Sequence, residues 1–226
     1  MPVTFHCFFE QSGTFKNEFK KLGYEAYDYD ILDDFGETDY KVDLFKEIDT
    51  AFERERERTV FDNVKEDDQI FAFFPCIRFE CKIPLWFRGQ AQQQKNWSDV
   101  QKLEYAMNLQ HELSDMYTWL SRLVIVCIRR NIKLIIENPY TQPHYLTNFF
   151  PIKPKLIDYD RSERGDNMRK PTQYWFINRE PSNNLFFEPQ VINEIRTHDS
   201  ISRNRDVVRS LISPDYANRF IREFII

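Results

Sequence analysis

The first thirty residues constrain the fold most strongly, because strand-like and helix-like segments alternate within them. Residues 3–9 form a short, mostly apolar run that predicts a buried strand, and residues 14–22 carry apolar side chains at helical spacing. Gly23 ends that helix, and residues 24–30 predict a second strand. A strand–helix–strand unit implies parallel strands joined by a right-handed crossover. The start of the chain therefore predicts an α/β fold.

The rest of the chain continues this alternation. Further strands are predicted over residues 69–74, 134–136, 155–159 and 173–177. Helices are predicted over residues 44–58, 98–130 and 145–150, and from Ser213-Pro214 onward. We expect a single domain, residues 1–226, built on a Rossmann-like, mostly parallel sheet with helices on both faces.

The longest predicted helix and two polar segments complete this outline. Ser98 and Gln101 form a capping box at the start of the long helix. Its apolar side chains predict a buried face made of Leu103, Met107, Leu113, Met116, Leu120 and Val124. Residues 33–43 and 78–96 are predicted to be loops, and the second is long enough to cover a functional site.

The net charge of the chain is small, and the charged residues are unevenly distributed along the sequence. The net charge of −5 argues against a non-specific grip on nucleic acid. Residues 1–120 hold 14 Lys+Arg and 24 Asp+Glu, whereas residues 121–226 hold 17 and 12. A surface that faces phosphates should therefore come from the second half, with a chance asymmetry as the alternative.

The cysteines and the apolar segments indicate in which cellular compartment the protein is expected. The cysteines are Cys7, Cys76, Cys81 and Cys127. The chain is too long and too poor in cysteine for a disulfide scaffold. The spacings between the cysteines fit no zinc pattern, so no metal site is expected. No signal-peptide pattern precedes the first strand, and the apolar stretch 119–128 is too short to span a bilayer. We expect a cytoplasmic protein with free thiols and no contact with a membrane.

Three segments far apart in the sequence carry reactive or polar side chains at predicted strand ends. They are residues 10–13, Pro75-Cys76 and residues 137–139. Ligands of open parallel sheets bind outside the carboxyl ends of the strands. We therefore expect these segments to converge in one cleft.

Two of these segments offer catalytic groups. Cys76 follows a proline at a strand end, where a thiolate would be a good nucleophile and a nearby helix N-terminus would lower its pKa. The alternative is a small buried apolar residue. Glu137 follows a buried apolar strand and precedes Asn138, and a partly desolvated carboxyl with a raised pKa can donate a proton to a ring nitrogen. The alternative for Glu137 is a structural cap.

The first turn suggests a nucleoside site. Gly13 before a helix lets backbone N–H groups approach a ligand, and the helix dipole favours an anionic group there. Asp30 ends the second strand, where doubly wound folds place an acid for ribose hydroxyls, with Asp28 as the alternative. Asp43 is a candidate for the adenine amino group.

Five segments together resemble a known family. They are Phe9-Glu10-Gln11-Ser12-Gly13-Thr14, Phe74-Pro75-Cys76, Glu137-Asn138, Arg169-Lys170-Pro171-Thr172 with Trp175 and Asn178, and Arg209-Ser210 with Ile212-Ser213-Pro214. In this order they resemble the DNA cytosine-C5 methyltransferases, and more closely the small methylase-like proteins of phages and gut bacteria. The first stands where that family has its Phe-x-Gly-x-Gly cofactor turn, and the second and third match its Pro-Cys and Glu-Asn motifs.

The resemblance implies a methyltransferase-type α/β fold without a separate target-recognition domain, with S-adenosylmethionine as cofactor. It implies that Cys76 attacks C6 of a cytosine and that Glu137 protonates N3, with Pro75 and Asn138 beside them. Cofactor contacts would come from Phe9 to Thr14, Phe74, Asp30 and Asp43. The candidates for contact with DNA or a cytosine nucleotide are Arg78, Arg88, Arg169, Lys170 and Thr172.

Departures from the family pattern leave two other functions open. Gln11 replaces the first glycine of the cofactor turn, and Glu10 adds a carboxylate beside the carboxylate of the cofactor. One alternative is a catalytically silent relative that binds a nucleotide-like ligand or a protein partner, in phage–host conflict for example. The other is a different modification of pyrimidine C5 that uses another donor.

Overall fold

The computed structural model describes residues 3–53, 57–80, 82–185, 188, 193–194 and 211–226. The strands are β1 (Thr4–Phe8), β2 (Glu25–Asp30), β3 (Tyr40–Lys41), β4 (Gln69–Phe73), β5 (Lys133–Pro139), β6 (Leu156–Asp158) and β7 (Thr172–Ile177). The helices are α1 (Thr14–Lys21), α2 (Leu44–Glu53), α3 (Ile83–Phe87), α4 (Asp99–Arg129), α5 (Tyr145–Phe149) and α7 (Pro214–Phe220). Arg209-Ser210, part of the resemblance, lies outside the described residues.

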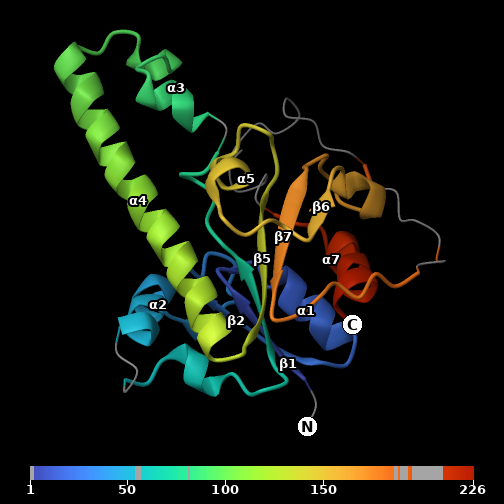
Figure 1. Ribbon diagram of the computed structural model, residues 1–226. Helices are drawn as coiled ribbons and strands as arrows, with labels where there is room; N and C mark the ends of the chain where they lie inside the picture. Colours follow the sequence, from blue (N-terminus) through green and yellow to red (C-terminus); the bar gives the residue numbers. More distant parts are fainter. Residues whose placement is uncertain (1–2, 54–56, 81, 186–187, 189–192, 195–210) are drawn as a thin grey trace.

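All strands of the described chain belong to one mixed sheet, in the order β3-β2-β1-β4-β5-β7-β6 (Figure 1). The pairs from β3 to β5 are parallel, which confirms the predicted mostly parallel α/β sheet. β7 runs antiparallel to both β5 and β6. The chain leaves β1 toward β2 on one side and continues with β4 on the other, so the strand order reverses between β1 and β4, where ligands of such sheets bind.

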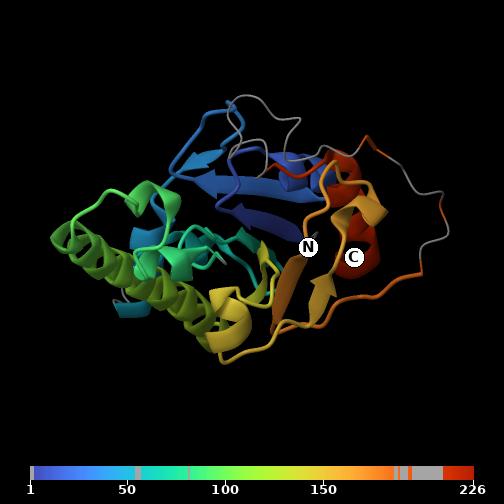
Figure 2. The same cartoon turned by 90° about the horizontal axis from the view of Figure 1, so that it is seen from above.

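Helices cover both faces of the sheet. α2, α4 and α5 pack on one face, in a core that includes Phe8, Ile48 and Leu120. α1 and α7 pack on the other face, in a core that includes Phe15 and Phe220. Figure 2 shows this layering from above, with α4 and α7 on opposite sides of the strands. Strand side chains point alternately to the two faces, so β1 serves both cores.

The long helix differs from its prediction in its first half. Leu113, Met116, Leu120 and Val124 are buried as expected, but Leu103 and Met107 are 65% and 72% exposed. Figure 1 shows the reason: the N-terminal half of α4 projects beyond the sheet and carries α3 at its far end. The apolar period of a helix says which side chains share a face, but not whether anything covers that face.

Other differences concern short elements and boundaries. The predicted loop 78–96 contains α3 and a 3₁₀ turn at Gln92–Gln94, held against α4 by contacts of Trp86 and Trp97 with Tyr105. The predicted loop 33–43 contains the two-residue strand β3. β5 continues through Pro139, because Glu137 and Asn138 pair with β7 and therefore belong to the strand.

Candidate active site

A cavity of about 350 Å³ opens at the carboxyl ends of β1, β4 and β5, a volume within the range of small-molecule sites. It is lined by Phe9, Glu10, Gln11, Ser12, Asp30, Phe35, Phe73, Phe74, Pro75, Cys76, Glu137, Pro139, Lys170, Leu211 and Ile212. All three segments expected to converge therefore reach it. Two other hollows lie around α2, away from these strand ends.

Cys76 lies on a tight turn directly after β4. Backbone N–H of Phe79 donates to the Cys76 carbonyl at 2.8 Å, and the side-chain amide of Asn138 donates to the Phe74 carbonyl at 2.7 Å. Asn138 is fully buried, so this second bond is shielded from water. The turn is thus fixed from both sides, and Cys76 is among the residues that line the cavity.

The thiol is not activated in the way the sequence suggested. The pKa of Cys76 is raised to about 11, mainly by burial and also by the nearby carboxylates of Glu137 and Glu80, while Lys170 opposes this increase. The Sγ atom lies 3.9 Å from Glu80 Oε1. The next helix, α3, begins only at Ile83, so the predicted lowering of the pKa by a helix N-terminus is not observed. Lys170 is the group that favours the thiolate.

Glu137 is a buried carboxyl within β5, in register with Phe73 of β4. Desolvation raises its pKa, and the cations Lys170 and Arg161 oppose that shift. Arg161 Nη1 lies 3.9 Å from Glu137 Oε1, and the same guanidinium is paired with buried Asp166. A carboxyl whose pKa is raised by burial is suited to donating a proton into the cavity.

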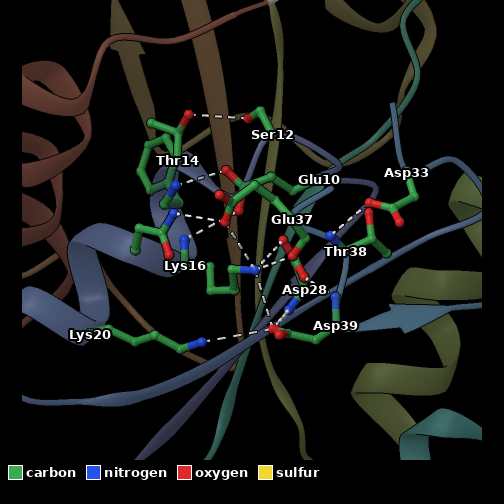
Figure 3. A network of polar contacts seen from close by, with 12 residues as sticks. Glu10, Ser12, Thr14, Lys16, Lys20, Asp28, Asp33, Glu37, Thr38 and Asp39 are labelled. Carbon is green, nitrogen blue, oxygen red and sulfur yellow. Dashed lines mark hydrogen bonds and ion pairs between the residues drawn. The ribbon is translucent and has the colours of Figure 1, made fainter. Parts of the chain in front are cut away.

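The N-terminus of α1 is capped from within the chain. Gly13 occupies the N-cap position with a left-handed φ of 64° and has no side chain to cap the helix. Glu10 takes that role: its Oε1 accepts from Phe15 N at 2.8 Å and its Oε2 from Lys16 N at 3.3 Å (Figure 3). Glu10 is buried, and desolvation raises its pKa to about 7.

An acidic loop, residues 33–39, packs over the same turn. A Cβ at Gly13 would come within 2.9 Å of Glu37 Oε2, so the space beside this glycine is filled by Glu37. Gln11 Oε1 accepts from Asp34 N at 3.1 Å and helps to hold the loop. Gly13 therefore accommodates a carboxylate of the protein itself, where the sequence suggested the anionic group of a ligand.

Buried Lys16 ties this loop to β2 (Figure 3). Its Nζ lies 3.0 Å from Asp28 Oδ2 and 3.4 Å from Asp39 Oδ2, and it donates to the Glu37 carbonyl. Asp28 is fully buried in this ion pair and also accepts from Asp39 N, so it serves the fold.

The two other acids suggested for the nucleoside differ in position. Asp30 is half-buried at the end of β2 and lines the cavity, which leaves it as the candidate for ribose hydroxyls. Asp43 accepts from Phe45 N and Lys46 N at the start of α2, and is not among the described residues that line the cavity. Asp43 is therefore a helix cap in this structure.

Of the five candidates for substrate or phosphate contact, Lys170 alone is among the described lining residues. Arg78 pairs with Glu112 of α4, and Arg88 is exposed at the end of α3. Arg169 is exposed and lies 3.8 Å from Asp160. Thr172 is fully buried and donates to the Lys170 carbonyl at 3.1 Å, which supports the position of that lysine.

Residues of the segment that resembles a cofactor turn lie beside the cavity. Phe9 has a positive φ of 58°, an uncommon conformation for phenylalanine, at the point where β1 enters the cavity wall. Ser12 and Thr14 share a hydrogen bond of 3.1 Å between their hydroxyls at the first turn of α1. Phe74 is buried against Phe9, with ring centroids 5.3 Å apart. The side of the cavity next to β1 is therefore lined by both aromatic and polar side chains.

The structure adds residues that the sequence analysis missed. Arg161 lies behind Glu137, Lys16 holds the acidic loop, and Phe35, Leu211 and Ile212 line the cavity. Arg161 and Lys16 follow no pattern that marks them as buried, because Lys and Arg are mostly exposed in proteins. The burial of both depends on carboxylates that come from other parts of the chain.

No model of a known protein family matches this chain, and no curated protein matches it either. None of the helices in the described part of the chain is long and apolar enough to cross a bilayer. Within the same residues, no three His, Cys, Asp or Glu side chains are grouped as ligands for a metal ion.

Proposed function

We propose that this protein modifies C5 of cytosine in DNA or in a nucleotide, with Cys76 as nucleophile and a methyl group from S-adenosylmethionine. The observation that carries the proposal is that Cys76 and Glu137, from adjacent parallel strands, line one cavity with Lys170. A nucleophile beside a buried carboxyl and a cation is the set that addition to a pyrimidine requires. The strand order, with a reversed β7 beside β5, also agrees with the methyltransferase-type sheet that the resemblance implies.

The chain's own residues would act in a defined order. The Cys76 thiolate forms a bond to C6 of the cytosine, and the Glu137 carboxyl places a proton on N3, so that the electron pair becomes available at C5. C5 would then take the methyl group, with the thioether of the donor as leaving group. The C5 proton would pass to a base, the N3 proton would return to Glu137, and the bond to Cys76 would break, which restores the aromatic ring and the thiolate. Lys170 stabilises the thiolate, and Asn138 holds the turn that carries it.

The cavity fits part of the cofactor well. Asp30 is placed for ribose hydroxyls, and Phe9, Phe35 and Phe74 offer aromatic surface to an adenine ring. Bound there, the cofactor supplies an electrophilic methyl group. The turn at Gly13 does not fit the carboxylate of its amino-acid part, because Glu10 and Glu37 occupy that position.

Trapping with a 5-fluorocytosine substrate tests the nucleophile. Fluorine at C5 cannot be removed as a proton, so a methylated adduct should stay bound to Cys76. The wild type is incubated with S-adenosylmethionine and either a 5-fluorodeoxycytidine oligonucleotide or 5-fluoro-dCMP, and intact mass is measured. A one-to-one adduct is expected for the wild type and for Cys127→Ala, a buried cysteine of the core, and none for Cys76→Ala.

A second candidate function is favoured by the covered turn at Gly13. A catalytically silent relative would bind a nucleoside-like ligand or a partner, and Cys76→Ala would bind as well as the wild type. Absence of an adduct with both substrates would contradict the proposed chemistry and favour this alternative. An adduct that forms without S-adenosylmethionine but with another donor would identify a different C5 modification.

A further inference from the structure

The side of the cavity next to β1 carries negative charge from carboxylates of the protein itself. Parallel sheets of this kind usually leave the first helix N-terminus to a phosphate or carboxylate of the ligand. Here Glu10 accepts hydrogen bonds from the backbone of Phe15 and Lys16, and Glu37 fills the space beside Gly13 (Figure 3). Two carboxylates of the protein thus surround the turn, and the helix dipole already stabilises Glu10.

The other charges of the cavity reinforce this polarity. Glu10 and Asp30 line its β1 and β2 side, while Lys170 is the only cationic side chain among the described lining residues and lies near Cys76 and Glu137. Lys16 is close to Glu10 in sequence, but its ammonium is engaged by Asp28 and Asp39. The cavity therefore has an acidic half at β1 and β2 and a cationic half beside the catalytic pair.

We infer that Glu10 makes the β1 side of this cavity select a nucleoside ligand that presents a positive charge there and reject one that presents a phosphate or carboxylate. This inference rests on the proposed adenosyl site. An anionic group of a ligand at the α1 N-terminus would lie beside the buried carboxylate of Glu10, which already accepts hydrogen bonds from two backbone N–H groups of that terminus. A sulfonium or ammonium group would instead be attracted. A cofactor of this site must place its own carboxylate away from Gly13.

Three adenosine derivatives that differ in charge at C5′ test the selection: 5′-amino-5′-deoxyadenosine, adenosine and adenosine 5′-monophosphate. Their dissociation constants are measured by calorimetry at pH 8, where Glu10 is ionised. The wild type should bind the amine most tightly and the phosphate most weakly, with roughly tenfold or more between the extremes, as expected for a partly screened charge pair. Glu10→Gln should reduce that ratio to near unity. Glu104→Gln on exposed α4 removes the same charge elsewhere and should keep the wild-type ratio.

A measurement on the wild type covers the case in which Glu10→Gln fails to fold. At pH 6 Glu10 is mostly protonated, and the preference of the protein for the amine over adenosine should shrink. The ionisable side chains that act on Glu10 are Cys7 and Asp28. Equal binding of all three ligands at pH 8 would overturn the selection by Glu10 and leave the adenosyl site standing. No binding of any of them would overturn the adenosyl site and this inference together, whereas the trapping of Cys76 tests the catalytic pair independently.

Discussion

The side-chain amide of Asn138 donates a 2.7 Å hydrogen bond to the backbone carbonyl of Phe74, and this bond joins the end of β5 to the turn that carries Cys76. The two residues are 64 positions apart in sequence, and both are buried. A buried bond between neighbouring strand ends fixes the distance between the groups that follow them. Asn138 is therefore a positioning residue for Cys76, while Glu137, one residue earlier, faces the cavity.

Asn138→Ala should loosen this turn. Loss of a buried hydrogen bond costs about 1–3 kcal/mol, measured as the free energy of unfolding in urea. The yield of the 5-fluorocytosine adduct should fall as well, because the thiol is no longer held in place. Asn178→Ala removes similar bonds to the Cys127 and Ile132 carbonyls, away from the cavity. If both variants lost adduct to the same extent at equal stability, a positioning role for Asn138 would be ruled out.

The reactivity of Cys76 should depend steeply on pH. With a pKa of about 11, the thiolate fraction at neutral pH is small, so alkylation by iodoacetamide should rise about tenfold per pH unit up to that range. Peptide mass spectrometry after timed alkylation follows Cys76 alone. Lys170→Met should slow the reaction at each pH, and Lys170→Arg should largely restore it, because Lys170 favours the thiolate. A rate that levels off near pH 8 would contradict the raised pKa.

Glu10 should make stability depend on pH. Burial raises its pKa from 4.5 to about 7, so between these values the folded protein keeps a proton that the unfolded chain releases. This stabilising contribution is complete below pH 4.5 and is lost as the pH rises through 7. The free energy of unfolding of Glu10→Gln relative to the wild type should therefore rise over this window, by at most roughly 3 kcal/mol. Urea titrations from pH 4.5 to 8 measure this difference, and a constant difference would refute it.

The ion pairs of Lys16 should contribute strongly to the free energy of unfolding, because they join the acidic loop to β2. Lys16→Met leaves Asp28 fully buried without its cation, and breaking a buried ion pair from one side costs roughly 3 kcal/mol or more. The double variant Lys16→Met/Asp28→Asn should recover much of the loss, because the buried charge is gone and Asn Oδ1 can still accept from Asp39 N. Urea unfolding of the wild type, the two single variants Lys16→Met and Asp28→Asn, and the double variant gives the coupling energy. Additive losses would show that the pair is not coupled.

The exposed half of α4 should tolerate charge. Leu103→Glu and Met107→Glu should change the free energy of unfolding by about 0.5 kcal/mol or less, because both side chains are exposed. Leu113→Ala, on the buried part of the same helix, should cost about 2–5 kcal/mol. Thermal and urea unfolding of the three variants check the contrast. A large loss for Leu103→Glu would mean that this surface is covered in solution.

The sequence by itself predicted the parallel strands β1, β2, β4 and β5, but not the reversal of β7 beside β5. Apolar runs of strand length, separated by helical periods and glycine stops, specify parallel strands with helices between them, because short-range geometry sets both periods. The order of strands then places the residues after β1, β4 and β5 at one edge. Cys76 and Glu137 could be assigned to a common cleft for that reason, before any side-chain contact was known.

Only the tertiary structure decided how the cleft is charged. Whether Asp28 or Asp30 faces the cavity, whether Leu103 is covered, and whether Gly13 faces a ligand or Glu37 all depend on segments distant in sequence. Glu10 is the clearest case. Its place in the sequence, just before the turn at Gly13, suggests contact with a cofactor, but in the structure its carboxylate caps α1. Local patterns encode the period and length of an element, but partners for buried charges are chosen by packing, because desolvation makes an unpaired charge too costly to leave.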